Sequence, residues 1–145
     1  MSGKIHPEVY ANYLFNQHQC YNILEPLAMA EGLLDKFPFI RRAPAIKADF
    51  DELWTYAHQP MMMESTRKYV EYANKELMDC PEKIMAHIYV RHMGDLSGGQ
   101  MIKRKVPGLG KYYEFKFNKN PEHGITYKDT HEIKEAVRLA VDSHY

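Results

Sequence analysis

The sequence predicts an all-α protein, a compact bundle of several helices. Apolar residues recur at helical spacing over several stretches, and prolines or capping residues stand where those stretches begin. The one segment that alternates like a strand, Tyr112 to Phe117, has no second strand to pair with, so we expect an extended connector there. Because 145 residues with 45% hydrophobic content suffice for one core, residues 1–145 are expected to form a single domain.

The first predicted helix runs from Pro7 to about Asp35. Proline suits a first helical turn, whereas Pro26 inside the run predicts a break near Glu25. Residues 37–39 are expected to form a packed turn. A second helix is predicted from Pro44 to Tyr56, ended by Pro60, with one side formed by Ile46, Phe50, Leu53 and Trp54.

The flexible run Met61–Met63 is expected to fill irregular space in the core. A third helix is predicted from Ser65 to Met78, with Ser65 as its N-cap. Its inward residues would be Tyr69, Tyr72 and Ala73.

A fourth helix would begin with Asp79 as cap and Pro81 in the first turn. Its buried stripe is predicted to consist of Ile84, Met85, Ile88, Met93 and Leu96. Residues 106–110 form a loop, and residues 118–124 are polar and rich in turn formers. A last helix is predicted from about Thr130 to Ser143, with Ile133, Val137, Ala140 and Val141 inward.

The composition argues against several kinds of partner. Lys and Arg number 19, as do Asp and Glu, so the formal net charge of +0 draws the chain neither to nucleic acid nor to an anionic membrane. No apolar run could span a bilayer, and the first ten residues lack the core of a secretory signal. Cys20 and Cys80 are too few for a disulfide framework, which predicts free thiols and a cytoplasmic location.

Three glycines in the fourth helix, Gly94, Gly98 and Gly99, need an explanation, since each costs up to about 1 kcal/mol relative to alanine. Gly94 and Gly98 lie one turn apart and leave a bare strip that a flat ligand can approach closely. Asp95 lies beside this strip, and Arg91 is spaced to pair with Asp95 on the same face. The alternative is that the glycines merely let two helices pack closely.

Two other functions meet obstacles in the sequence. The letters LSGGQ at residues 96–100 match the signature of ATP-binding-cassette ATPases, but no phosphate-binding Gly-x-x-x-x-Gly-Lys loop accompanies them. A di-iron oxidase needs several carboxylates and histidines that converge on two metals. The Asp95 helix offers no second carboxylate at the required spacing.

The whole string at residues 87–103, HIYVRHMGDLSGGQMIK, resembles the distal-helix motif of the heme oxygenase family. Other blocks follow in the family's order. Residues 16–25 (NQHQCYNILE) look like its second core helix, and Arg42, Ile46, Asp49 and Phe50 are similar to an Arg-x-x-x-Leu-x-x-Asp-Leu segment. Residues 112–115 resemble the aromatic connector, and residues 133–138 resemble the helix that follows it.

In this family heme is both cofactor and substrate. Oxygen is activated at the iron, one meso carbon is hydroxylated, and the ring opens to biliverdin with release of carbon monoxide and iron. The resemblance implies that Asp95 holds a distal water and that Arg91 and Tyr21 orient the network. Residues expected to contact heme are Gly94, Gly98, Ser97 and His87, with Lys134 and Arg138 on the propionates. It also implies an external electron donor, such as a ferredoxin or a reductase.

The sequence departs from the family at the proximal side of the heme. Family members carry the iron-ligating histidine on a helix that precedes the block matched by residues 16–25, and this chain has only 15 residues there. Their C-terminal helices are also missing, so the chain is expected to be a core truncated at both ends. Replacement ligands would be His18, which shares a face with Tyr21, or His6; otherwise a second subunit would supply the ligand.

Three hypotheses remain open from the sequence. The first is a minimal heme oxygenase, which the distal and propionate residues favour. The second is a non-catalytic carrier of heme or another tetrapyrrole, because the proximal helix is absent. The third is a structural or protein-interaction role on the same fold. In each case the missing helix should expose apolar surface, which favours a homodimer.

Overall fold

The structure is a computed structural model that describes residues 5–35, 37–115, 134–135 and 138–139. Its α-helices are α1 (Pro7–Ala30), α2 (Ala43–Leu53), α3 (Glu64–Tyr72) and α4 (Pro81–Ile102). Shorter helical segments are η1 (Pro38–Ile40), η2 (Ala73–Leu77) and η3 (Lys111–Tyr113). Within these described ranges no strand occurs, which confirms the all-α class.

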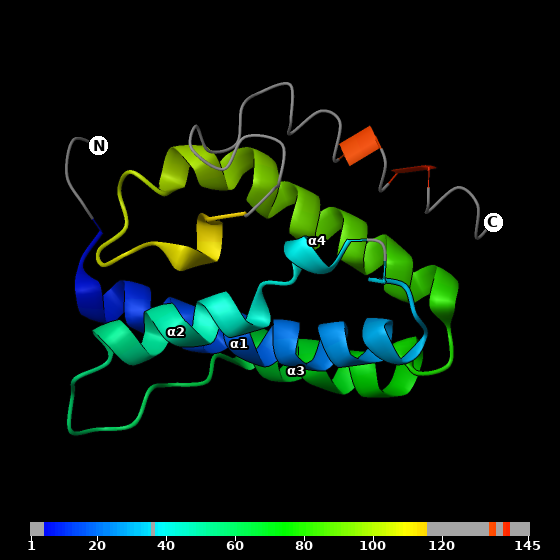
Figure 1. Ribbon diagram of the computed structural model, residues 1–145. Helices are drawn as coiled ribbons and strands as arrows, with labels where there is room; N and C mark the ends of the chain where they lie inside the picture. Colours follow the sequence, from blue (N-terminus) through cyan, green and yellow to red (C-terminus); the bar gives the residue numbers. More distant parts are fainter. Residues whose placement is uncertain (1–4, 36, 116–133, 136–137, 140–145) are drawn as a thin grey trace.

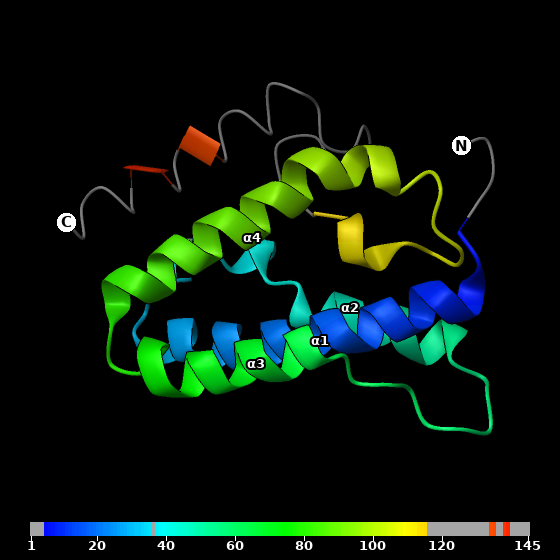
Figure 2. The same cartoon turned by 180° about the vertical axis from the view of Figure 1, so that it is seen from behind.

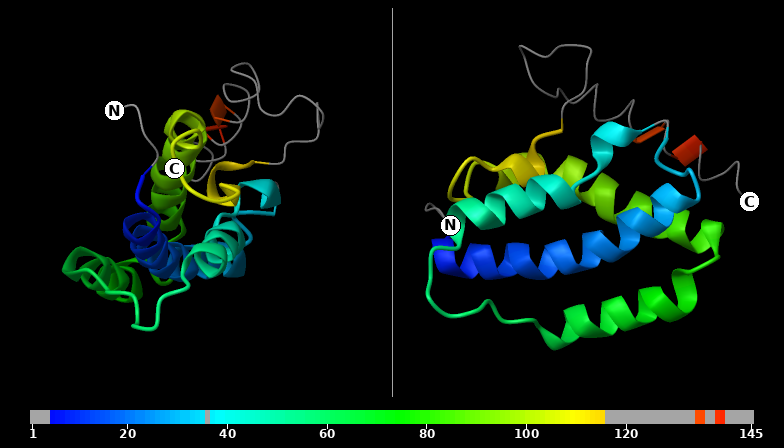
Figure 3. Two further views of the ribbon diagram at one scale, coloured as in Figure 1. Left: turned by 90° about the vertical axis from the view of Figure 1, so that its left-hand side faces the viewer. Right: turned by 60° about the horizontal axis from the view of Figure 1, so that its bottom comes forward.

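Helix α1 is the centre of the arrangement. It lies between α2 and α3 in one layer, and α4 crosses over that layer (Figures 1 and 3). The view from behind shows α3 alongside α1 (Figure 2). The short segment η3 packs against both α2 and α4. This arrangement brings one end of α4, the middle of α1 and η3 together.

Two buried apolar clusters hold these layers. The larger one joins α1, η2 and α4 and includes the whole stripe predicted for α4: Ile84, Met85, Ile88, Met93 and Leu96. The smaller one joins α1, α2 and η3, and it includes Tyr10, Leu14, Tyr21, Ile46 and Tyr112. Cys20 and Cys80 are free thiols, as expected. Across the described residues, no helix has the length and apolar character needed to cross a membrane.

Helix α1 differs from its prediction at two places. It continues through Pro26 without the break expected near Glu25. Pro26 lies on the exposed face together with Asn22, whose backbone carbonyl the proline cannot bond, so water can satisfy that carbonyl. The helix ends at Ala30 rather than near Asp35, because Gly32 adopts the left-handed conformation (φ 71°) that terminates helices.

The predictions for α2 and the methionine run need correction. Helix α2 ends at Leu53, before Tyr56 and Pro60, with Trp54 at its C-cap. Met61, Met62 and Met63 do not fill the core, since they are 68%, 43% and 48% exposed. Asn12 and Asn16 of α1 bind the backbone of Met61 and Met63 at 2.7–2.9 Å. These bonds fix the run by its main chain and leave its side chains outward.

The junction between α3 and α4 also differs from its prediction. Met63 is the N-cap of α3, so Ser65 lies inside the helix and is not its cap. Tyr72 is 38% exposed, whereas Ala73 is buried as predicted. Cys80 rather than Asp79 is the N-cap of α4, because Asp79 takes a left-handed turn conformation (φ 64°).

The structure describes only part of the C-terminal region for which the sequence predicts a connector and a last helix. Instead of an extended connector, residues 111–113 form the helical turn η3. Lys134, Glu135, Arg138 and Leu139 are helical, within the helix expected from Thr130 to Ser143. Residues 118–124 and the inward positions predicted for the last helix (Ile133, Val137, Ala140 and Val141) lie outside the described residues.

A buried polar contact joins α1, α2 and α4. Glu25 and His92 are both 0% exposed, and His92 Nε2 lies 2.8 Å from Glu25 Oε2. His92 Nδ1 lies 3.1 Å from the carbonyl oxygen of Ile88, which can only accept, so Nδ1 carries a proton. The Glu25 carboxylate also accepts from the backbone N–H of Arg42 and of Ala43 at the start of α2. The Glu25 carboxylate therefore binds α4 through His92 and caps the N-terminus of α2.

We expect Glu25→Ala to destabilise the fold by about 3–5 kcal/mol, because it leaves buried His92 and two backbone N–H groups without their acceptor. Although burial opposes its ionisation, the hydrogen bonds from His92, Arg42 and Ala43 hold the pKa of Glu25 below its ordinary value. The stabilisation should therefore be lost as the pH falls below the ordinary carboxyl range. Urea unfolding at several pH values measures both effects. Glu64→Ala, which removes an exposed ion pair with Arg67, should leave the midpoint unchanged.

Candidate functional site

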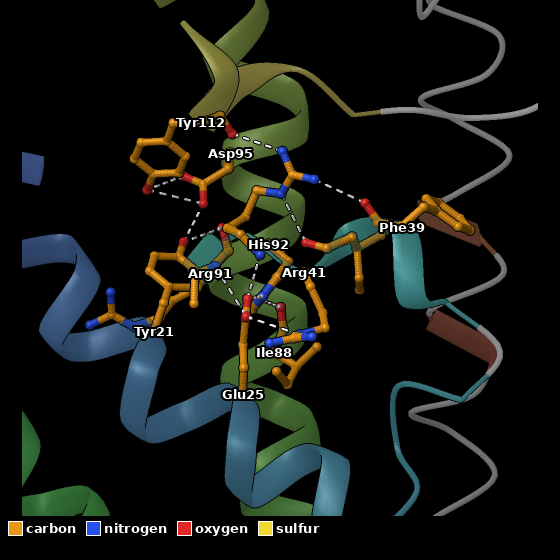
Figure 4. Close-up of polar contacts among 12 residues, drawn as sticks. Tyr21, Glu25, Phe39, Arg41, Ile88, Arg91, His92, Asp95 and Tyr112 are labelled. Carbon is orange, nitrogen blue, oxygen red and sulfur yellow. Dashed lines mark hydrogen bonds and ion pairs between the residues drawn. The ribbon is translucent and has the colours of Figure 1, made fainter. Parts of the chain in front are cut away.

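The Asp95 carboxylate of α4 accepts hydrogen bonds from two tyrosine hydroxyls (Figure 4). Tyr21 Oη, from α1, donates a short bond to Oδ2 of Asp95. Tyr112 Oη, from η3, lies 3.1 Å from Oδ1 and 3.2 Å from Oδ2. Tyr21 and Tyr112 are each 1% exposed, and their rings pack edge to face with centroids 6.0 Å apart. Three separate elements thus converge on one carboxylate.

The environment makes Asp95 easier to protonate than an ordinary aspartate. Burial raises its pKa above the usual range, and this effect outweighs the hydrogen bonds from Tyr21 and Tyr112, which favour the charged form. Burial, with the nearby Asp95 charge, also raises the pKa of Tyr21 and of Tyr112. The phenols therefore keep their protons and act as donors, while the carboxylate is the group that gains or loses a proton more readily.

Tyr112 reaches Asp95 because two buried side chains fix the main chain of η3. Asp49 of α2 accepts from the backbone N–H of Lys111 and Tyr112, at 3.0 and 2.7 Å. The Arg42 guanidinium donates to the backbone carbonyls of Tyr112 and Glu114, both at 2.9 Å. The same guanidinium lies over the ring of Phe115. These bonds attach η3 to α2, and so place its first tyrosine under α4.

Arg91 does not pair with Asp95, although their spacing allows it. Its guanidinium lies 4.1 Å from the ring centroid of Tyr69 in α3 and 5.8 Å from that of Tyr21. The contact between Arg91 and the Asp95 group is indirect, since Tyr21 Oη lies 3.4 Å from the backbone oxygen of Arg91. The structure therefore places Arg91 behind Tyr21, where it packs on aromatic faces.

The three glycines of α4 fall into two groups. Among the described residues, a β-carbon added to Gly94 or Gly98 would have no neighbour within 4 Å, so these two form an open strip on the exposed side of the helix. A β-carbon added to Gly99 would lie 2.3 Å from Cδ1 of Tyr113, which is 3% exposed. Close packing within the described part of the chain therefore explains Gly99, and it gives no reason for Gly94 or Gly98.

The predicted histidines lie away from Asp95. His87 bridges α4 to α3, with Nδ1 3.0 Å from Tyr69 Oη and Nε2 3.3 Å from Tyr72 Oη. His18 lies within α1, and its pKa is lowered by burial and then by the charge of Lys47 in α2. His6 is the N-cap of α1 and accepts from the backbone N–H of Glu8 at 3.2 Å.

The remaining predicted site residues are exposed or half-buried. Ser97 is exposed on α4 next to the open strip. Lys134 is half-buried, and exposed Arg138 forms an ion pair with Glu135 one turn earlier. In the part of the chain that the structure describes, no three His, Cys, Asp or Glu side chains are placed to hold a metal ion.

Sequence reasoning missed the second hydroxyl on Asp95 and the buried groups that support it. Tyr112 was expected only as part of an aromatic connector, and neither His92 nor the role of Glu25 was expected. A polar residue inside an apolar stripe is the one available signal: His92 stands beside Met93 in the buried face of α4. A buried histidine needs a hydrogen-bond partner. That partner, Glu25, lies 67 residues away in the sequence, so no local pattern around His92 identifies it.

Comparison with known proteins places this geometry in context. The family model described as heme oxygenase matches residues 1–138. The chain is 34% identical over 103 residues to "Heme oxygenase 2" of Oryctolagus cuniculus, covering 63% of this chain and 32% of that protein. It is 28% identical over 137 residues to the "Heme oxygenase" of Rhodella violacea, covering 88% and 51%. The chain thus spans about a third of the length of the first of these relatives and about half of the second.

Two solved structures share the fold. A heme oxygenase from Leptospira interrogans matches with a TM-score of 0.77 and 28% identity, over 99% of this chain and 73% of that one. A heme oxygenase from the cyanobacterium Synechocystis, solved in complex with heme, matches with a TM-score of 0.65 and 22% identity, over 95% and 74%.

Tyr112→Phe should raise the pKa of Asp95 further, because it removes a hydroxyl that favours the ionised carboxylate. Tyr21→Phe should raise it more, since the hydrogen bond from Tyr21 lowers the pKa of Asp95 more than that from Tyr112 does. Carboxyl carbon NMR of the protein labelled at aspartate measures the titration directly. Tyr56→Phe, in the loop after α2, is the matched control and should leave the pKa of Asp95 unchanged. An unshifted titration in both Tyr112→Phe and Tyr21→Phe would contradict this account of the site.

Replacing the glycines by alanine should have opposite effects on stability. Gly94→Ala and Gly98→Ala should each raise the free energy of unfolding by about 0.5–1 kcal/mol, because alanine suits a helix better and its methyl group meets no described residue. Gly99→Ala should lower it by about 1–3 kcal/mol, because the new methyl group collides with the buried Tyr113 ring. Urea unfolding of the three variants tests this, and a loss of stability in all three would refute the division.

Proposed function

Since the chain belongs to the heme oxygenase family, we propose that it binds heme and cleaves it oxidatively to biliverdin, with release of carbon monoxide and iron. The observation that supports this best is the open Gly94–Gly98 strip beside the Asp95 carboxylate. A bare helix face suits a flat macrocycle, and a carboxylate held at its edge suits chemistry that consumes protons. Heme, when bound, would supply the iron at which oxygen is activated and the carbon that is attacked.

In this proposal Asp95 handles the proton. Its pKa lies above the usual range because of burial, so it can hold a water or pass a proton without remaining permanently charged. Tyr21 and Tyr112 orient the carboxylate from two sides, and Arg91 supports Tyr21 from behind. Gly94 and Gly98 let the ligand approach the helix backbone, and the lack of side chains there would influence which meso carbon reacts.

Charged and polar groups around the strip would complete the binding site. Lys134 and Arg138 are the proposed partners of the propionates, since cations bind carboxylates with strong hydrogen bonds. Ser97 is exposed beside Gly98, where its hydroxyl is available to a ligand. Both ring nitrogens of His87 are hydrogen-bonded to the hydroxyls of Tyr69 and Tyr72. His87 would therefore act on heme indirectly, by holding these two tyrosines in place.

The proximal ligand and the partners remain predictions from the sequence. His18 and His6 are the candidates in this chain, and a second subunit in a homodimer is the alternative source. Oxygen is the second substrate, and a ferredoxin or a reductase in the cytoplasm would supply electrons. The exposed apolar side chains of Val90 and Met101 flank the glycine strip on α4, which is consistent with a surface that a ligand or subunit covers.

A carrier of heme or another tetrapyrrole is the second candidate. It is favoured by the places of the two candidate ligands, since His6 is the N-cap of α1 and bonds the backbone N–H of Glu8, and His18 lies within α1. A carrier needs the open face and the cations, but it does not need protein ligation of the iron or proton transfer by Asp95.

Mixing the protein with hemin and a reductant in air should yield biliverdin and carbon monoxide, which absorption spectra and a carbon monoxide trap detect. Asp95→Asn should bind hemin but lose most bilin formation. Gly98→Leu should lower hemin affinity at least tenfold without unfolding the protein, because about 1.4 kcal/mol of lost contact corresponds to that factor. Hemin bound tightly with no bilin product would instead establish the carrier, and absence of hemin binding would exclude both functions.

A further inference from the structure

Five tyrosines gather around Asp95, more than the proposed chemistry uses. They come from two segments of the chain: Tyr10, Tyr13 and Tyr21 lie on α1, and Tyr112 and Tyr113 lie on η3. Four of them are at most 3% exposed, and Tyr13 is 43% exposed. Apolar side chains would fill this space equally well, so a series of phenols that leads from the surface to a buried carboxylate calls for a separate explanation.

The rings are in contact along this series. Tyr21 and Tyr112 have centroids 6.0 Å apart, and Tyr112 stacks on Tyr113 with centroids 4.2 Å apart and planes within 13°. Tyr113 and Tyr13 are neighbours, since each affects the pKa of the other. The exposed Tyr13 is therefore linked through Tyr113 and Tyr112 to Tyr21, and the rings from Tyr113 to Tyr21 are in contact. An electron can cross such short steps by hopping.

Asp95 supplies what the oxidation of a phenol requires. A tyrosine that loses an electron becomes strongly acidic and must release its proton to a base at once. The hydroxyls of Tyr21 and Tyr112 already donate to the carboxylate of Asp95, so the proton moves along an existing bond. Tyr10 is the contrast: its hydroxyl is buried and has no hydrogen-bond partner among the residues that the structure describes, so its oxidation would leave the proton with no acceptor there.

We propose that the series Tyr13, Tyr113, Tyr112 and Tyr21 is an electron relay, in which Asp95 accepts the proton of the tyrosine that is oxidised. One electron leaves Tyr21 or Tyr112 for a one-electron oxidant at the Gly94–Gly98 face. The proton moves from the phenol oxygen to Asp95, which yields a neutral tyrosyl radical and a neutral carboxylic acid. The relay then moves the radical to Tyr13: an electron from Tyr13 passes by way of Tyr113 to the buried radical, Asp95 returns its proton to the reduced phenol, and Tyr13, which is 43% exposed, releases its own phenol proton to water. A soluble reductant such as ascorbate or a thiol then donates a hydrogen atom to the Tyr13 radical.

The relay would serve to remove an oxidising equivalent that is formed at the site and not used. Its natural oxidant would be a heme activated by peroxide, and this part of the proposal rests on the proposed function. The relay itself is a property of the chain's own phenols. It can therefore be tested on the protein without heme, so that its failure is distinguishable from a failure to bind or cleave heme.

The test uses flash excitation of tris(bipyridine)ruthenium(II) with persulfate, which generates a one-electron oxidant in the protein solution. Samples frozen at increasing delays are examined by electron paramagnetic resonance. We expect a tyrosyl signal that persists after radicals on exposed tyrosines have coupled, with its largest g value (gx) lowered by a hydrogen bond from Asp95. Asp95→Asn, and the double variant Tyr21→Phe with Tyr112→Phe, should each abolish this long-lived signal.

Tyr10→Phe is the matched control, because it removes a buried tyrosine of the same cluster that has no proton acceptor; the signal should be unchanged. Tyr13→Phe should leave the long-lived radical but prevent ascorbate from reducing it rapidly. If the double variant unfolds by circular dichroism, Asp95→Asn and the g value of the unaltered protein still decide the matter. A long-lived signal that survives Asp95→Asn, or a g value typical of a phenoxyl without a hydrogen bond, would overturn the proposal.

Discussion

The arrangement of the whole site depends on the buried carboxylate of Glu25. It receives His92 from α4 and the first backbone N–H groups of α2, while its own backbone belongs to α1. A buried charge is tolerated only when its hydrogen bonds are satisfied, so the position of each of these three helices is tied to the other two. Apolar packing alone would allow α4 to slide or rotate over α1. The polar contact fixes one register, and in that register Tyr21 of α1 lies under Asp95 of α4.

A second polar unit extends this constraint to the connector after α4. Asp49 and Arg42 are both buried and bind the main chain of η3 from opposite directions, one as acceptor and one as donor. These bonds hold the Tyr112 hydroxyl at Asp95 even though η3 is only a short helical turn. This arrangement lowers stability at Asp95 itself, because burial raises the pKa of its carboxyl group. Asp95 therefore destabilises the folded state once the pH is high enough to ionise it. The hydrogen bonds that lower the pKa of Glu25 stabilise the folded state and offset this loss.

The sequence was most informative where a pattern is local. The helical stripe of α4 and its glycine string identified the fold class and the open face, because periodicity and backbone freedom are written in neighbouring letters. The contacts of Glu25, His92 and Asp49 were not predictable, since their partners lie far along the chain. Two errors have the same origin. Arg91 has the spacing to reach Asp95, but its guanidinium packs on the ring of Tyr69 instead. The methionines at 61–63 point outward because Asn12 and Asn16 bind the backbone of this run.

The open strip on α4 has a consequence for the energetics of the whole molecule. Two helical glycines without neighbours lower the stability of the turn that carries Asp95, and nothing within the described chain compensates for them. Whatever covers this strip would therefore bind only the folded state and stabilise it by mass action. The melting temperature would then vary with ligand concentration, and the unliganded chain would be the form most exposed to proteolysis. Through these two glycines, the supply of ligand would regulate the amount of protein that persists.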